Sequence, residues 1–142
     1  MAVLARSELT HACAPALLTT LLQAGQIHQY PDQTYICHFG DPLPDLILLL
    51  EGNLEASRVG MGGKRHVVAY LKVGQFFGLL TVIDRKGAPQ DIRCHGDATV
   101  LRVPMDIVRR LCEESPQLQQ SLLALICERN RALYDAMSAQ AR

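Results

Sequence analysis

The amino-acid sequence predicts a mainly β protein, an antiparallel sandwich or roll with helices at both ends. Between residues 26 and 104, short apolar runs alternate with turn signals rich in Gly, Pro, Asp and Asn, which is the pattern of many short antiparallel strands. On both sides of this region, apolar residues recur at helical spacing. The length of 142 residues suits one compact domain, and a content of 49% apolar and 20% charged residues is typical of a globular protein.

The first elements can be placed from local sequence. Helical apolar spacing over residues 15–24 is followed by Gly25, a residue typical of a helix C-cap. The flexible segment 60–63 (GMGG) lies between two apolar runs and is typical of a hairpin tip. The predicted strands are 46–52 (LILLLEG), 53–59 (NLEASRV), 66–73 (HVVAYLKV) and 98–104 (ATVLRVP).

Two helices are predicted after Pro104. The first, 105–115, is amphipathic and carries Asp106 in its first turn, where an acid is favoured by the helix dipole. The second begins at Pro116, with Ser115 as its expected N-cap, and runs close to the C-terminus. The predicted organisation is an N-terminal helical segment (1–25), a β domain (26–104) and a pair of C-terminal helices (105–142).

The last helix carries a stripe at alternating spacings of three and four, with one polar member. A buried Asn in such a seam favours a registered two-stranded pairing. A second apolar face, formed by Leu118, Leu122 and Leu125, is left to pack on the β domain. We therefore expect a homodimer through this helix, the alternative being that the stripe packs on its own domain. The stripe consists of Leu123, Ile126, Asn130, Leu133 and Met137.

Charge and hydropathy exclude several classes of partner. The 14 basic residues are balanced by 14 acidic ones, whereas binding to phosphates of nucleic acid needs a clustered positive surface. No apolar run is long enough to span a bilayer, and acid and His interrupt the apolar N-terminus, so neither a membrane segment nor a signal peptide is expected. Five widely spaced cysteines without a CxxC pair indicate reduced thiols in a cytoplasmic protein.

Two Cys-His dipeptides, Cys37-His38 and Cys94-His95, raise the question of a metal or haem site. Adjacent residues of a strand point to opposite faces, so the two side chains of one dipeptide cannot hold the same ion. We expect each dipeptide to supply one buried thiol and one surface imidazole, and we expect no metal site and no catalytic residue.

Read in order, several stretches resemble the cyclic-nucleotide-binding domain of the Crp/Fnr family of bacterial transcription regulators. Tyr30-Pro31 with Tyr35-Ile36 is similar to the first strand of that domain, and 39–52 is similar to its glycine-aspartate stretch. Residues 73–78 (VGQFFG) resemble the opening of its phosphate-binding cassette, and 100–111 resembles its last strand and second helix. The resemblance implies an antiparallel β-roll, double-stranded and jelly-roll-like, with a short N-terminal helix and a long C-terminal dimerisation helix.

The cassette departs from the family pattern at both charged ligand contacts. Family members that bind cyclic AMP carry a Glu after the Phe-Gly pair and an Arg further along, and the resemblance places Leu79 and Ala88 at these positions. Charge-assisted hydrogen bonds contribute about 1.5–3 kcal/mol each, so we expect that cyclic AMP is not bound in the usual way. The alternative is a genuine cyclic-nucleotide-binding module that uses Arg85 or Arg93.

The resemblance still implies a degenerate effector pocket, for a cyclic nucleotide or another small effector. Gly78 lets the backbone approach a ligand and opens a short helix. We expect Leu79, Leu80 and Leu133 to fill this pocket, the alternative being that they line an open apolar one. The expected pocket residues are Phe77, Gly78, Leu79, Leu80, Ala88, Pro89, Gln90 and Tyr134.

In the family, a helix-turn-helix that reads DNA follows the dimer helix, and this chain ends at Arg142, where that domain would begin. We therefore interpret the chain as the sensor domain of a transcription regulator that contacts DNA only through a domain absent from this chain. Alternatives are a free sensor module, the regulatory domain of a channel or transporter, and a haem or redox sensor using Cys94 and His95. An iron–sulfur sensor is not expected because only Cys13 precedes the β domain, and a cupin enzyme is not expected because no His-x-His pair occurs.

Overall fold

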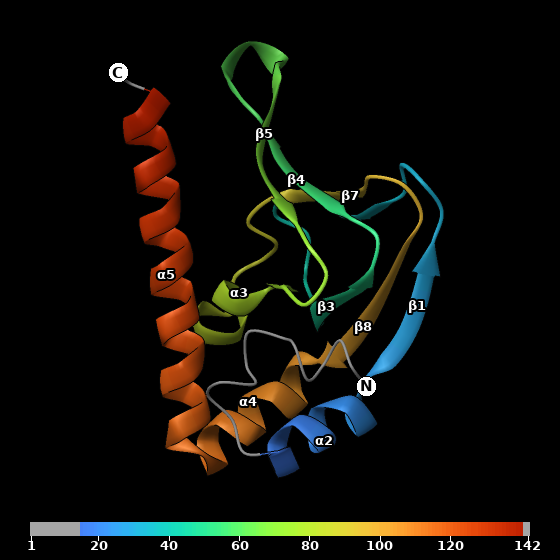
Figure 1. The fold of residues 1–142 in the computed structure, drawn as a ribbon, viewed down its shortest axis with the longest axis vertical. Helices are drawn as coiled ribbons and strands as arrows, with labels where there is room; N and C mark the ends of the chain where they lie inside the picture. Colours follow the sequence, from blue (N-terminus) through green and yellow to red (C-terminus); the bar gives the residue numbers. More distant parts are fainter. Residues whose placement is uncertain (1–14, 141–142) are drawn as a thin grey trace.

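The computed structural model describes the backbone of residues 15–140 and the side chains of residues 19–132, 134 and 135. Its centre is a roll of two four-stranded antiparallel sheets, which confirms the predicted fold class (Figure 1). One sheet has the strand order β1-β8-β3-β6 and the other β2-β7-β4-β5. The strands are β1 (Gln26–Tyr30), β2 (Tyr35–Cys37), β3 (Asp45–Glu51), β4 (Leu54–Val59), β5 (Arg65–Leu71), β6 (Phe76–Phe77), β7 (Asp91–Cys94) and β8 (Ala98–Pro104).

The helices lie at the predicted positions. The side-chain oxygen of Ser115 accepts a hydrogen bond from the Leu118 N–H at 3.2 Å, which confirms the expected N-cap, and Asp106 lies in the first turn of its helix. In Figure 1 the last helix runs along one side of the roll, and two shorter helices lie across its lower end. The helices are α2 (Pro15–Ala24), α3 (Leu79–Asp84), α4 (Met105–Glu114) and α5 (Pro116–Gln140), with a short 3-10 helix, η2 (Met61–Gly63).

The core is aliphatic, as the scarcity of aromatic residues requires. Strand β3 is buried on both faces over residues 46–49, and it pairs with β8 along most of its length. From α5, the side chains of Leu118, Leu122 and Leu125 are buried in the same core. The second apolar face of this helix therefore packs on the domain, as predicted.

Strands β4 and β5 form a hairpin that extends away from the roll (Figure 1). Its tip is η2, which confirms the prediction for residues 60–63. The base of the hairpin pairs with β7 and joins the second sheet. The hairpin therefore places part of β5 opposite α5, with space between them that the next section describes.

The Cys-His dipeptides divide between core and surface as predicted. Cys37 and Cys94 are buried, whereas His38 and His95 are exposed. Burial raises the pKa of the Cys37 thiol to about 11, because loss of solvent disfavours the thiolate, and it raises the pKa of Cys94 as well. Over the described residues, no cluster of three or more metal-ligating side chains is present, and no helix is both long and apolar enough to cross a bilayer.

Candidate effector site

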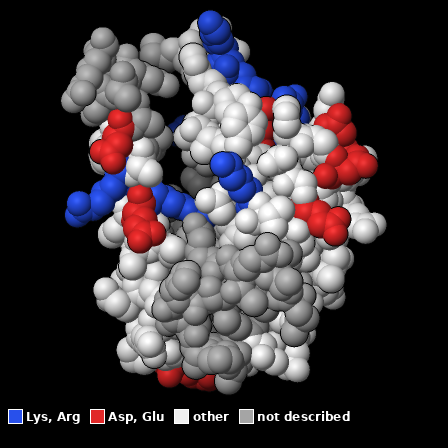
Figure 2. Space-filling view, in the orientation of Figure 1, with Lys and Arg blue, Asp and Glu red and all other residues white. Residues whose placement is uncertain are grey.

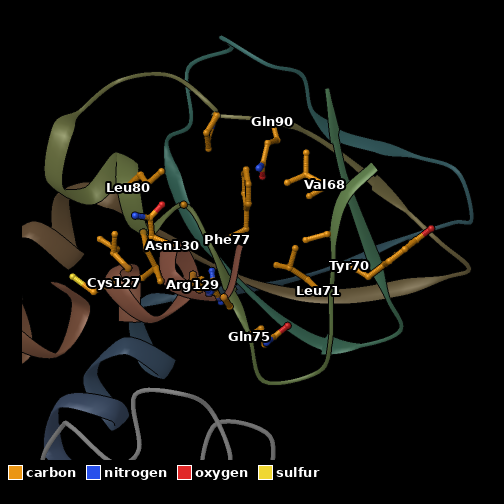
Figure 3. A pocket seen from close by; sticks show the side chains of 17 residues that line it. Val68, Tyr70, Leu71, Gln75, Phe77, Leu80, Gln90, Cys127, Arg129 and Asn130 are labelled. Carbon is orange, nitrogen blue, oxygen red and sulfur yellow. The ribbon is translucent and has the colours of Figure 1, made fainter. Parts of the chain in front are cut away.

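A cavity of about 690 Å³ lies between the roll and α5 (Figure 3). Its walls come from three parts of the chain. The first is the β4–β5 hairpin, the second runs from β6 through the start of α3 to the loop before β7, and the third is the middle of α5. The lining residues are Ala56, Val68, Ala69, Tyr70, Leu71, Gln75, Phe77, Gly78, Leu79, Leu80, Pro89, Gln90, Ile126, Cys127, Arg129, Asn130 and Ala132.

Six of the eight expected pocket residues line this cavity, namely Phe77, Gly78, Leu79, Leu80, Pro89 and Gln90. Ala88 is not among the lining residues. Its backbone is instead bonded to a neighbouring turn, where its N–H donates to the Asp41 carbonyl and its carbonyl accepts from the Gly40 N–H, both at 2.8 Å. Tyr134 also falls outside the lining, and its side chain is 62% exposed.

The expectation that leucine side chains fill the pocket is wrong. Leu79 is buried in the hydrophobic core, whereas Leu80 stays 46% exposed beside the cavity. The third residue of that expectation, Leu133, has its side chain outside the described part of the chain. Leu79 and Leu80 both line the cavity and leave about 690 Å³ of it open, which agrees with the alternative of an open, largely apolar pocket.

Gly78 shapes the cavity wall where β6 passes into α3. Its φ of 108° is in the left-handed region, which favours glycine, and its carbonyl accepts the Val82 N–H at 3.2 Å as the helix begins. A Cβ at this position would lie 3.1 Å from side-chain atoms of both Leu43 and Met105. Backbone conformation and close packing therefore both require glycine at residue 78.

Two arginines from the C-terminal helices hold this part of the wall. From α4, Arg109 donates hydrogen bonds to the carbonyls of Thr81 at 2.8 Å and Val82 at 3.2 Å. From α5, Arg129 donates to the Phe76 carbonyl. The segment 76–82 is thus linked at both ends to helices that follow it in sequence.

Sequence reasoning did not single out either arginine. Both contacts join a side chain to a backbone carbonyl far away in sequence, and no motif or spacing marks such a contact. The one available signal was that each arginine lies on a helix that also carries an apolar, core-facing stripe.

Neither arginine considered as a replacement for the family's phosphate ligand reaches the cavity. Arg85 follows α3 and is exposed, and Arg93 donates to the buried carboxylate of Glu55 at 3.1 Å. Among the lining residues that the structure describes, Arg129 alone carries a formal charge. On the face shown in Figure 2, basic and acidic residues are interspersed without a continuous basic surface.

The predicted dimer stripe and the cavity share one side of α5. Ile126 and Asn130 line the cavity, and Leu123 is 38% exposed one turn earlier. The side chains of Leu133 and Met137, the other two members of the stripe, lie outside the described part of the chain.

Comparison with known proteins places this architecture in a family. Residues 27–115 match the sequence model of the family described as "Cyclic nucleotide-binding domain". The chain belongs to this family. The match covers the roll and α4, and it confirms the resemblance inferred from the glycine-punctuated strands.

Two relatives are regulators named for cyclic AMP. The chain is 26% identical over 125 residues to the "Cyclic AMP receptor protein" of Thermus thermophilus, covering 88% of this chain and 58% of the relative. It is 24% identical over 105 residues to the "cAMP-activated global transcriptional regulator CRP" of Haemophilus influenzae, covering 72% of this chain and 46% of the relative. The chain therefore spans about half the length of these two relatives.

A relative of another kind is "Lysophospholipase nte1" of Aspergillus terreus, 28% identical over 120 residues, which cover 84% of this chain and 7% of the relative.

Among solved structures, the Thermus thermophilus Catabolite Activator Protein has a TM-score of 0.82 at 24% identity, covering 95% of this chain and 63% of the other. The sensor domain of the transcriptional regulator DNR from Pseudomonas aeruginosa has a TM-score of 0.78 at 17% identity, and the match covers 94% of this chain and 89% of the other. These structures share the fold of the chain.

Proposed function

We propose that this chain is an effector-sensing, dimerising regulatory domain of the Crp/Fnr type, and that it does not bind cyclic AMP in the usual way. The observation that carries the proposal is the cavity between the cassette and α5. At the position where cyclic-AMP-binding members of the family have a Glu, this cavity is lined by the apolar residue Leu79. At the position where they have an Arg, Ala88 is buried and is not among the lining residues. No catalytic role is proposed for any residue of this chain.

The construction of the cavity supports a sensing role. Buried leucines fix the first half of α5 to the rest of the domain, whereas residues of this helix between 126 and 132 border the cavity. A ligand in the cavity contacts both the cassette and α5, and Arg129 already joins the two through the Phe76 carbonyl. Occupancy of the cavity would therefore act directly on the position of the second half of α5.

The proposed dimer forms through α5, with Leu123 at its exposed face. Leu80 and Ile83 of α3, a helix that contacts α5, are also exposed apolar residues. In a complete regulator, the dimer helices would pass the signal to a DNA-reading domain, and such a regulator acts in the cytoplasm. This assignment rests on the named relatives, about half of whose length the chain covers.

The ligand part of the proposal is tested by titrating cyclic AMP into the purified chain in a calorimeter. Because both charged anchors are missing, we expect no binding heat at micromolar nucleotide. Micromolar affinity would overturn the proposal and favour a genuine cyclic-nucleotide module. In that case the Arg85→Ala and Arg93→Ala variants would show which arginine replaces the missing one.

The dimer part is tested by sedimentation at tens of micromolar protein. We expect a dimer for the wild-type chain and a monomer for Leu123→Asp, with the melting temperature of the monomeric unit unchanged. Gln120→Asp is the matched control because it adds the same charge to an exposed position of α5 that is outside the stripe. A wild-type chain that stays monomeric at these concentrations would overturn the dimer.

A further inference from the structure

We propose that the effector of this cavity is an uncharged, mostly apolar molecule with an amide-like hydrogen-bonding edge, held between the side-chain amides of Gln90 and Asn130. This inference rests on the proposed sensing function and specifies the ligand class of the same site. It follows from the size of the cavity, from the polar groups that point into it and from its charge.

The cavity has the size and surface of a small-molecule site. Its volume of about 690 Å³ lies within the usual range for drug-sized ligands. Val68, Leu71, Phe77, Leu80 and Ile126 supply most of an apolar lining, with the Phe77 side chain in the middle of the space (Figure 3). Burial of apolar ligand surface against these side chains is the main source of affinity that such a lining offers.

Two side-chain amides face this apolar space from different elements. In Figure 3, Gln90 comes from the loop before β7 and its amide end points toward Phe77, whereas Asn130 comes from α5 and its amide end lies beside Leu80. Neither amide makes a hydrogen bond to another group in the described part of the chain, whereas the amide oxygen of Gln75 already accepts the Lys72 N–H at 2.9 Å. Gln90 and Asn130 therefore keep donors and acceptors for a ligand.

An amide carries donors and acceptors but no charge, and its best complement is another amide, a lactam or a similar neutral edge. A ligand that forms hydrogen bonds with both Gln90 and Asn130 connects the loop before β7 to α5. A sensing domain requires such a connection. A purely apolar ligand would leave both amides unpaired in a partly dry site, at a cost in affinity.

The charged residues of the described lining disfavour cations and offer an anion one partner at most, Arg129. No acidic residue is found among the described residues that line the cavity, so a cation would lose its water without gaining a counter-ion. Arg129, the one cation in the part of the lining that the structure describes, donates a hydrogen bond to the Phe76 carbonyl and so holds the cavity wall. A phosphodiester would find no second charged anchor in the described lining, because Leu79 stands where the family has a Glu and Ala88 is turned away.

The test uses three probes that share one ring system: 2-naphthamide, which is neutral with an amide; 2-naphthoate, which is anionic; and 2-methylnaphthalene, which has no polar group. Affinities are measured by protein NMR titration, and site-resolved iodoacetamide labelling of Cys127, which lines the cavity, locates the probe. We expect 2-naphthamide to bind about tenfold more tightly than either other probe and to slow labelling of Cys127.

Two variants test whether the side-chain amides of Gln90 and Asn130 bind the probe. Gln90→Leu and Asn130→Leu should each weaken 2-naphthamide about five- to tenfold, as loss of one hydrogen bond predicts, while leaving 2-methylnaphthalene unchanged. Gln120→Leu, on the exposed surface of α5 and outside the lining, is the matched control and should change neither affinity.

The outcomes separate the two proposals. If 2-naphthoate binds as tightly as 2-naphthamide, or if the Gln90→Leu and Asn130→Leu variants bind 2-naphthamide like the wild-type chain, the neutral-amide inference is overturned and the sensing function stands. If none of the probes binds or protects Cys127, the neutral-amide inference is overturned, while the calorimetric titration of cyclic AMP tests the sensing function independently of these probes.

Discussion

Arg65 and Asp91 are joined by a 2.7 Å hydrogen bond between a guanidinium Nη1 and a carboxylate Oδ2. Arg65 opens β5 beside the hairpin tip, and Asp91 opens β7 directly after the cavity residue Gln90. The other oxygen of Asp91 accepts the Phe39 N–H at 2.6 Å. Asp91 is only 5% exposed. Its carboxylate therefore holds three parts of the chain in place relative to one another: the β4–β5 hairpin, the turn that contains Phe39 and the end of the loop before β7.

The first prediction concerns the stability of this junction. Asp91→Ala removes the acceptor of the Phe39 N–H and the carboxylate partner of Arg65, whose guanidinium keeps only its 2.9 Å hydrogen bond to the Ser57 hydroxyl. We expect the free energy of unfolding to fall by about 2 kcal/mol. Urea denaturation followed by circular dichroism measures the change. The control is Asp106→Ala, which removes a 95% exposed carboxylate and should cost less than about 0.5 kcal/mol. Equal losses in the two variants would show that the junction does not contribute to stability.

The second prediction is the pH dependence of that stability. Burial alone would raise the pKa of Asp91, but the hydrogen bonds from the Phe39 N–H and Arg65 outweigh it and hold the pKa below its ordinary value of 3.8. In the unfolded chain this carboxyl takes up its proton near the ordinary value. The stabilisation is therefore complete above about pH 4 and is lost as the pH falls through the lower pKa of the folded state.

The measurement for this second prediction is urea denaturation of wild type and Asp91→Asn between about pH 3 and pH 6. The wild-type midpoint should fall more steeply on acidification than that of Asp91→Asn, which has no carboxylate to protonate. Both proteins also carry His38→Gln, because the His38 ring nitrogen lies 3.8 Å from the Asp91 carboxylate and would otherwise interact differently in the two proteins. Parallel curves would contradict the assignment of the acid-sensitive stability to Asp91.

The Asp91 junction also shows where sequence reasoning ends. Apolar runs separated by turn residues were enough to predict the antiparallel roll and its flanking helices, because each strand or helix is encoded over a few neighbouring residues. The partners of Asp91 are 26 and 52 residues away, and no spacing in the sequence marks them. Tertiary contacts of this kind are fixed by the packing of the sheets and not by local pattern.

The candidate site, like the fold, could be predicted only where its residues are neighbours in the sequence. The cassette residues 77–80 line the cavity because they form a continuous strand-to-helix turn at a position that the resemblance identified. The contributions of Arg129 and Cys127 were missed because they depend on how α5 lies against the roll. The expectation of a filled pocket was wrong because sequence alone does not show how much of the space between the cassette and α5 the side chains of Leu79 and Leu80 occupy.

The third prediction concerns the thiols. Cys37, Cys94 and Cys112 are buried, and desolvation raises the pKa of each, that of Cys37 to about 11. Cys127 is exposed, so iodoacetamide should modify it at least about 100-fold faster at neutral pH than the buried thiols. Peptide mass spectrometry resolves the sites and separates them from Cys13, which lies outside the described residues. In urea the rates should converge, whereas fast labelling of Cys37 in the folded protein would contradict its place in the core.

The fourth prediction separates two neighbouring leucines of α5. Leu122 is fully buried against the roll, and Leu123 is 38% exposed on the proposed dimer face. Leu122→Ala leaves a cavity in the core and should lower the free energy of unfolding by about 3 kcal/mol, whereas Leu123→Ala should lower it by less than about 1 kcal/mol. Denaturation is measured at a protein concentration low enough for the chain to be monomeric, because self-association would otherwise add to the stability of the wild type.

The same pair of variants should behave in the opposite way in sedimentation. Leu123→Ala removes apolar surface that the monomer exposes, so it should weaken self-association while the monomer stays folded. Leu122→Ala changes no exposed surface and should self-associate like the wild type below its melting temperature. If the two variants lose stability and association in equal proportion, the helix does not divide into a core face and a dimer face. Opposite effects would assign the two functions of α5, anchoring to the roll and pairing with a second copy, to adjacent residues of one turn.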